Sequence, residues 1–225
     1  MLFEVFTRPD LVERIRPVCE SAVDPSTGDI DSIKLCRSPL LQSILAEVLR
    51  IRVQGLIVRS TTRSVELEGW KFPKDVYLVA PSNFGNFNEA VWNEGTMESP
   101  HALDTFWPDR FLIYPDDPAS GPLRINDATM SQSRQEDDAS QGPRYSEQGL
   151  KGAYFPFGGN MHPCPGRQFS QHEVINTVAI LVLNYEVEIC VKPRWTPKMK
   201  TNHFSFGTLP PMEKVQFRIR RRCPS

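Results

Sequence analysis

Proline content limits the possible fold of this chain more than any other feature. The 225 residues include 20 prolines, whereas an average content of about 5% corresponds to roughly 11 in a chain of this length. Because proline fixes φ and has no backbone N–H, it interrupts helix interiors and central strands. We therefore expect short elements joined by fixed turns, with few long uninterrupted helices.

Three segments have the periodicity of helices. Apolar residues spaced by three and four predict a helix over 3–23, although Pro9 and Pro17 interrupt its face. Ser38-Pro39 supplies an N-cap and a first-turn proline before an apolar stripe, which predicts a helix over 39–51. The segment 166–184 is apolar on most sides towards its end, as in a helix buried in a larger body.

Other segments have the pattern of strands. Short pieces at 56–58, 64–67 and 76–80 are separated by turn signals, which predicts a small sheet. Apolar and polar residues alternate over 214–220, as in a half-buried strand with a basic face. We expect the nearby arginines to protect an edge strand from pairing; they are Arg218, Arg220, Arg221 and Arg222. The predicted fold class is α+β, mainly helical with a small antiparallel sheet.

Residues 126–149 differ in composition from the rest of the chain. They contain no Leu, Ile, Val or Phe and are rich in Ser, Gln, Asp and Glu. Such a segment buries too little apolar surface to offset the entropy lost on ordering. We therefore expect one domain over 1–225 with a disordered surface insertion at 126–149.

Charge and cysteine content exclude several classes of protein. The 26 basic and 27 acidic side chains give a formal net charge of -1, which argues against a nucleic-acid-binding chain. No apolar run is long enough to span a bilayer, and the N-terminus lacks the pattern of a secretory signal. The 5 cysteines are an odd number at scattered positions, so we expect no disulfide framework and a reducing compartment.

The segment 157–167, Phe-Gly-Gly-Asn-Met-His-Pro-Cys-Pro-Gly-Arg, is a loop that leads directly into the last predicted helix. Free backbone N–H groups and the helix dipole favour the thiolate of a cysteine placed there. A thiolate is both a soft metal ligand and a nucleophile. Gly158 and Gly159 allow the backbone to approach something flat or bulky.

Two kinds of site compete for this cysteine. Zinc would require further paired ligands, but His162 is too close in sequence to Cys164 to serve easily with it, and there is no second Cys or His pair elsewhere. The sequence therefore disfavours zinc. A catalytic cysteine would require a base such as His172 or His203, and the sequence alone leaves that reading open.

The same loop resembles the haem-binding signature of the cytochrome P-450 family, F-x-x-G-x-x-x-C-x-G, followed by an arginine. Asn160 replaces the glycine that the family nearly always has. The resemblance implies that Cys164 is the axial thiolate ligand of the haem iron, that His162 donates to a haem propionate and that Phe157 packs beside the thiolate. It also assigns three further residues to the cofactor-binding loop: Gly158, Gly166 and Arg167.

Two further motifs stand in the order that this family shows. Glu47 and Arg50 form an E-x-x-R pair, and 106–111 resembles the P-x-R-F segment, whose arginine, here Arg110, joins that pair. By resemblance this structural network fixes the backbone under the haem pocket and does not touch substrate. By periodicity alone the E-x-x-R pair lies off the apolar stripe, as in an ordinary solvated ion pair. Arg59 resembles an arginine that pairs with a propionate, or is an ordinary strand-end arginine.

The resemblance implies the C-terminal, haem-proximal half of the family fold. No segment matches the family's long central helix, so we expect a fragment, a mispredicted gene product or a truncated paralogue. The implied activity is that of a haem-thiolate monooxygenase, which inserts one oxygen atom of O₂ into a lipophilic substrate with electrons from a reductase partner. A longer form would act at the endoplasmic reticulum membrane. The alternative is a non-catalytic remnant, at most a weak haem-binding or interaction module.

Overall fold

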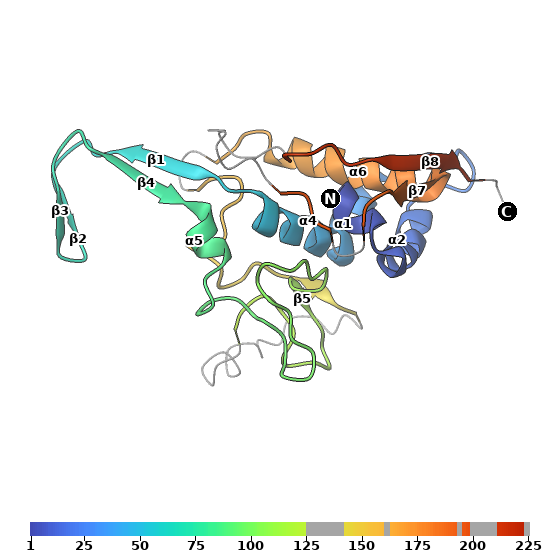
Figure 1. Ribbon diagram of the computed structural model, residues 1–225, viewed down its shortest axis with the longest axis horizontal. Coiled ribbons are helices and arrows are strands. Elements are labelled where there is room, and N and C mark those ends of the chain that lie inside the picture. Colours follow the sequence, from blue (N-terminus) through green and yellow to red (C-terminus); the bar gives the residue numbers. More distant parts are fainter. Residues whose placement is uncertain (125–141, 160–162, 193–194, 199–210, 223–225) are drawn as a thin grey trace.

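The protein has an α+β fold in which a group of helices lies beside small antiparallel sheets (Figure 1). The computed structural model describes residues 1–124, 142–159, 163–192, 195–198 and 211–222. The helices are α1 (Leu2–Phe6), α2 (Pro9–Ser21), α3 (Ser32–Arg37), α4 (Pro39–Arg52), α5 (Ser82–Asn86) and α6 (Arg167–Asn184). The strands are β1 (Leu56–Ser60), β2 (Val65–Leu67), β3 (Trp70–Phe72), β4 (Tyr77–Pro81), β5 (Leu112–Ile113), β6 (Arg144–Tyr145), β7 (Tyr185–Ile189) and β8 (Phe217–Arg221).

Prolines and caps set where the helices begin. The hydroxyl of Ser38 accepts the Leu41 N–H at 3.4 Å, and Pro39 occupies the first position of α4, so the helix predicted over 39–51 is confirmed. The helix predicted over 166–184 is also confirmed, as α6. The single helix expected over 3–23 is wrong: it divides into α1 and α2, because the second helix restarts at Pro9. Pro17 is accommodated inside α2.

The described strands form four two-stranded antiparallel sheets in place of the one small sheet expected: β1–β4, β2–β3, β5–β6 and β7–β8. The three strand segments predicted between 56 and 80 are present in β1, β2 and β4. Figure 1 shows β1–β4 extending away from the helices, with the β2–β3 hairpin at its far end. A glycine at position 69, with φ of 78°, completes the tight turn of that hairpin.

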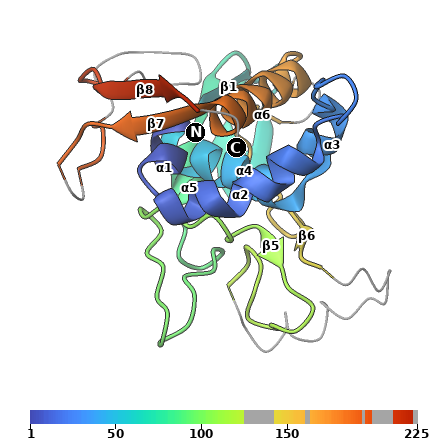
Figure 2. The ribbon, with the colours of Figure 1, turned by 90° about the vertical axis from the view of Figure 1, so that its right-hand side faces the viewer.

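Two apolar clusters meet at α4. The larger one joins α1, α2, α4 and α6, and its fully buried members include Val5, Leu11, Ile15, Leu41, Ile44 and Val178. The smaller one surrounds Ala46 of α4 and contains Trp92, Leu103, Phe111 and Leu150. The second view shows the long loop segments on the opposite side of the helices from β8 (Figure 2). Helix α4 is therefore covered on more than one face.

The disordered insertion predicted at 126–149 is not disordered throughout. Residues 125–141 lie outside the described residues, but the end of the segment forms β6, which pairs with β5. The Ser146 N–H donates to the Phe111 carbonyl at 3.0 Å, and the Tyr145 ring stacks on the Phe111 ring at 6.0 Å between centroids. Backbone hydrogen bonds and one aromatic ring thus order a segment that has no aliphatic side chains to bury.

The expectation of a half-buried strand near the C-terminus is wrong. All five residues of β8 are exposed, with Phe217 at 60% and Ile219 at 47%. Strand β8 pairs with β7 alone among the described strands, and its apolar side chains are not covered. Two of the arginines instead form cross-strand ion pairs, Arg220 with Glu186 and Arg218 with Glu188. Within the described residues, no helix has the length and apolarity needed to cross a membrane.

Candidate cofactor site and its buried charge network

The cysteine loop folds back on itself just before α6. The Cys164 N–H donates to the Phe157 carbonyl at 2.8 Å, and the Gly158 N–H donates to the Phe155 carbonyl at 3.0 Å. Gly158 has a φ of 76°, a conformation that favours glycine. At the far end, the Arg167 backbone and guanidinium both donate to the Cys164 carbonyl at 3.3 Å, and Gly166 is the N-cap of α6.

The structure brings Arg59 and the cysteine loop together across a hundred residues of sequence. The Arg59 guanidinium donates to the Gly159 carbonyl at 3.2 Å and to its neighbour, the Val58 carbonyl, at 2.9 Å. Both Arg59 and Cys164 are exposed. His162, the third predicted group here, lies outside the described residues, as does Asn160. The thiol of Cys164 on the loop and the guanidinium of Arg59, which contacts the loop from β1, are thus both accessible to a bound group.

The chemistry of these groups fits a haem. Haem iron accepts a thiolate as its axial ligand, and the propionates are carboxylates that a guanidinium pairs with. A Cβ added at Gly159 would meet nothing within 4 Å, so space adjoins the backbone where Arg59 contacts the loop. The described residues contain no group of three or more His, Cys, Asp or Glu side chains that could hold a metal ion.

A cavity of about 420 Å³ adjoins the other side of the same loop. Phe157, Gly158 and Pro163 line it together with residues of α4 and α6, whereas Cys164 and Arg59 do not belong to its lining. Cys164 and Arg59 are therefore not part of this cavity, whereas Phe157, Gly158 and Arg167, which the resemblance also assigns to the cofactor-binding loop, are. Of the two possible bases for a nucleophilic cysteine, His172 lies against the Ser32 hydroxyl at 3.1 Å, and His203 is outside the described residues.

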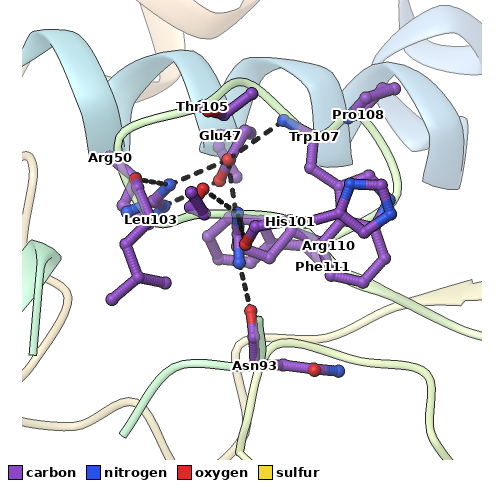
Figure 3. Close-up of polar contacts among 12 residues, drawn as sticks. Glu47, Arg50, Asn93, His101, Leu103, Thr105, Trp107, Pro108, Arg110 and Phe111 are labelled. Carbon is purple, nitrogen blue, oxygen red and sulfur yellow. Dashed lines mark hydrogen bonds and ion pairs between the residues drawn. The ribbon is translucent and has the colours of Figure 1, made fainter. Parts of the chain in front are cut away.

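Glu47, Arg50 and Arg110 form the network that the sequence motifs predict, and all three side chains are 0% exposed. Arg50 donates to both carboxylate oxygens of Glu47, from Nε at 2.8 Å and from Nη2 at 2.9 Å. Arg110 Nε donates to Glu47 Oε1 at 3.0 Å (Figure 3). The Trp107 backbone N–H donates to the same oxygen at 3.2 Å. One carboxylate thus joins α4 to the segment that contains Arg110.

Backbone carbonyls accept most of the remaining guanidinium protons. Arg50 donates to the Asn86 carbonyl at 2.7 Å and to the Leu103 carbonyl at 2.6 Å. Arg110 donates to the carbonyls of Asn93, His101 and Ala102. Burial lowers the pKa of Arg110 from its ordinary value, while the neighbouring Glu47 carboxylate opposes that shift. The buried guanidinium groups of Arg50 and Arg110 therefore fix several loop segments at once, because each carbonyl that accepts a hydrogen bond from them is held in place.

Helical periodicity did not indicate that the Glu47–Arg50–Arg110 network is buried. The larger apolar cluster covers one face of α4, while Trp92, Leu103 and Phe111 cover another. The guanidinium carbon of Arg50 lies 5.2 Å from the centroid of the Trp92 ring. Periodicity detects only the face that packs on apolar neighbours, so charged residues buried by loops cannot be identified from it.

Two aromatic residues that the sequence analysis missed connect this network with the cysteine loop. Tyr154 precedes the loop, and its hydroxyl donates to the Ala46 carbonyl in α4 at 3.0 Å. The Trp92 ring contacts the Tyr154 ring at 5.9 Å and the Phe111 ring at 5.6 Å between centroids. Both residues lie outside the motifs, so the only signal for them in the sequence was the size of their aromatic side chains.

Comparison with known proteins agrees with this arrangement of motifs. The family model described as Cytochrome P450 matches residues 1–217. The chain belongs to the cytochrome P450 family. Members of this family contain haem and generally receive electrons from a redox partner, and the α+β fold of the chain is consistent with a cytochrome P450 domain.

The cytochrome P450 relatives are longer proteins. Cytochrome P450 monooxygenase efuG of Hormonema carpetanum is 42% identical over 193 residues, which are 85% of this chain and 33% of that protein. Cytochrome P450 monooxygenase fsoE of Humicola fuscoatra is 36% identical, over 98% of this chain and 38% of that protein. Cholesterol 7-alpha-monooxygenase of Cricetulus griseus is 23% identical, over 97% of this chain and 40% of that protein. The chain thus spans between a third and two fifths of the length of these relatives.

Proposed function

We propose that this chain is the C-terminal, haem-proximal part of a haem-thiolate monooxygenase. The observation that carries the proposal is the exposed Cys164 just before α6, on a loop that the Arg59 guanidinium contacts from β1 at the Gly159 carbonyl. The buried Glu47–Arg50–Arg110 network lies in the order along the chain that the resemblance to the family implies. Three separate sequence motifs therefore support one function.

The proposed site residues divide into those that would hold the cofactor and those that hold the loop. Cys164, after loss of its thiol proton, is the ligand of the haem iron, and Arg59 and His162 pair with the propionates. Phe157, Gly158, Gly166 and Arg167 shape the loop through the backbone hydrogen bonds and conformations described above.

Glu47, Arg50 and Arg110 act on the backbone and not on the substrate. Their side chains are fully buried and contact carbonyl groups of the surrounding loops. Through Ala46 and Tyr154 they also hold the segment that enters the cysteine loop. We therefore assign them a structural role in the position of Cys164.

When bound, haem supplies the metal centre at which one atom of O₂ is inserted into an organic substrate, with electrons from a reductase. The substrate class we propose is lipophilic, and a longer form would act at the endoplasmic reticulum membrane. Support for the reaction comes from the relatives named as monooxygenases. We propose this monooxygenase activity for a longer protein that contains this sequence.

The absorption spectrum of the reduced, carbon monoxide-bound chain after addition of haem tests the assignment. We expect a thiolate-ligated spectrum that Cys164→Ala abolishes, since no other described cysteine precedes a helix on a glycine-rich loop. Cys36→Ala and Cys190→Ala are matched controls and should retain the spectrum. A spectrum unchanged in Cys164→Ala would refute the ligand assignment, and absence of any thiolate spectrum in the wild-type chain would favour the non-catalytic remnant.

A further inference from the structure

Glu4 is a second buried carboxylate that contacts two arginines. It lies on α1, outside every motif considered above, and its side chain is 3% exposed. Its Oε2 accepts from Arg8 Nη1 at 2.8 Å, and its Oε1 accepts from Arg52 Nε at 3.1 Å. Both oxygens are thus occupied by guanidinium groups, as they are in Glu47. The proposed function gives this cluster no role.

The two arginines connect Glu4 to the same two chain segments that Glu47 joins. Arg52 is the last residue of α4, the helix that carries Glu47. The guanidinium carbon of Arg8 lies 4.7 Å from the centroid of the Phe106 ring. The next residue, Trp107, donates its backbone N–H to Glu47 Oε1 at 3.2 Å. Glu4, through Arg8 and Arg52, and Glu47, through its own hydrogen bonds, therefore both link α4 to the segment that begins at Phe106.

We propose that Glu4 is a positioning residue, which acts through Arg8 and Arg52 on the Glu47–Arg50–Arg110 network. The Glu4 carboxylate holds Arg8 over the Phe106 ring, where a cation is attracted to the aromatic face. It holds the end of α4 through Arg52. Both contacts keep the Trp107 N–H within reach of Glu47. The two carboxylates therefore fix α4 against residues 106–110 as one unit.

Substitution of Glu4 should weaken this unit, because the two arginines that Glu4 holds can be solvated by water instead. The Arg8 and Arg52 side chains are 31% and 24% exposed, so without the carboxylate they can turn to water. Phe106, which is 7% exposed, then loses the cation that covers its ring. Glu4 and Glu47 have different arginine partners but act on the same two segments, and groups coupled through a shared backbone shift have non-additive effects on stability.

A double-mutant cycle in urea unfolding of the full chain without haem tests the proposal. We expect Glu4→Gln and Glu47→Gln each to lower the folding equilibrium constant more than tenfold. The double variant should lose at least fivefold less than the product of the two single losses. A double loss equal to that product would overturn the proposal. Because haem is absent, the result is independent of the proposed enzymatic function.

Glu186→Gln is the matched control, because Glu186 is an exposed carboxylate with one arginine partner, Arg220. Combined with Glu47→Gln, it should give a loss equal to the product of the single losses. Coupling of the same size in this control would show that the cycle reports a general property of the chain. In that case the assignment of Glu4 would fail.

Hydrogen exchange provides a readout that general destabilisation does not move. At low denaturant, Glu4→Gln should increase the exchange rate of the Trp107 amide at least tenfold more than it increases the exchange rates of the α6 amides. Arg8→Gln, which alters a partly exposed side chain, should have the same local effect if Glu4→Gln does not fold. Uniform acceleration in both segments, or an unchanged Trp107 amide in Arg8→Gln, would overturn the proposal.

Discussion

The Glu47 network and the cysteine loop differ in where their polar groups point. Glu47, Arg50 and Arg110 are fully buried, and each contacts groups of the chain itself. Cys164 and Arg59 are exposed, and within the described residues the Arg59 guanidinium donates to two carbonyls, those of Val58 and Gly159. The first region is saturated by internal hydrogen bonds, whereas the second leaves a sulfur atom and a cation available.

The buried network should contribute mainly to the stability of the fold, whereas the exposed groups at the loop should contribute mainly to ligand binding. A buried charge needs its partners, because an unpaired ion in the interior costs several kcal/mol. An exposed thiol or guanidinium is solvated and costs little when unpaired. We therefore expect substitutions in the network to change stability, and substitutions at the loop to change ligand binding with little change in stability.

Glu47→Gln should produce the largest effect on stability. It removes the charge that two buried arginines share, so we expect the free energy of unfolding to fall by about 3–5 kcal/mol. Chemical denaturation measures the loss. The exposed Glu66, opposite Lys71 in the β2–β3 hairpin, offers a control in Glu66→Gln, which should unfold as the wild type does. A loss below about 1 kcal/mol in Glu47→Gln would show that the interior is more solvated than its burial indicates.

Arg59→Gln should leave stability nearly unchanged and weaken haem binding roughly fivefold, the effect of about 1 kcal/mol for one exposed, charge-assisted hydrogen bond. Titration of the chain with haem measures the dissociation constant. Haem dimethyl ester has no propionate charge, so its affinity should be equal for the wild type and Arg59→Gln. If the variant weakens binding of both compounds equally, Arg59 supports the loop and does not pair with a propionate.

Local signals were sufficient to predict the isolated elements of this fold. Ser38 and Pro39 indicated an N-cap and a first-turn proline, so the sequence predicted α4 to within one residue of its observed end. The glycines and prolines around Cys164 indicated a loop before a helix, as the structure shows. These features depend on residues within one or two turns, which the sequence contains directly.

Features that depend on distant packing could not be predicted in this way. Glu47 is buried because loops from far along the chain cover it, and β8 is exposed because no described element covers its apolar side chains. Ser146 belongs to an ordered segment through a hydrogen bond to Phe111, which composition does not record. The predicted site residue Arg59 contacts the Gly159 carbonyl, which is distant in the sequence, so no local pattern could predict this contact.

Cys19, unlike Cys164, is a buried cysteine, and we expect it to have a smaller effect, on the pH dependence of stability. It is 0% exposed on α2, and burial raises the pKa of its thiol from 9.0 to about 11. The thiol is therefore neutral in the folded chain at a pH where it ionises in the unfolded chain. Its contribution to stability is complete below about pH 9 and is lost as the pH rises towards 11, because the unfolded state releases the proton first.

The free energy of unfolding should consequently fall by about 1 kcal/mol more between pH 8 and pH 10 in the wild type than in Cys19→Ala. Urea unfolding at both pH values measures this difference, and taking the difference between the two proteins cancels the lysines and tyrosines that titrate in both. The cavity left by alanine lowers stability equally at each pH and therefore does not enter. Equal pH dependence in the two proteins would mean that water reaches Cys19, and that its burial in the core formed by α2, α4 and α6 is incomplete.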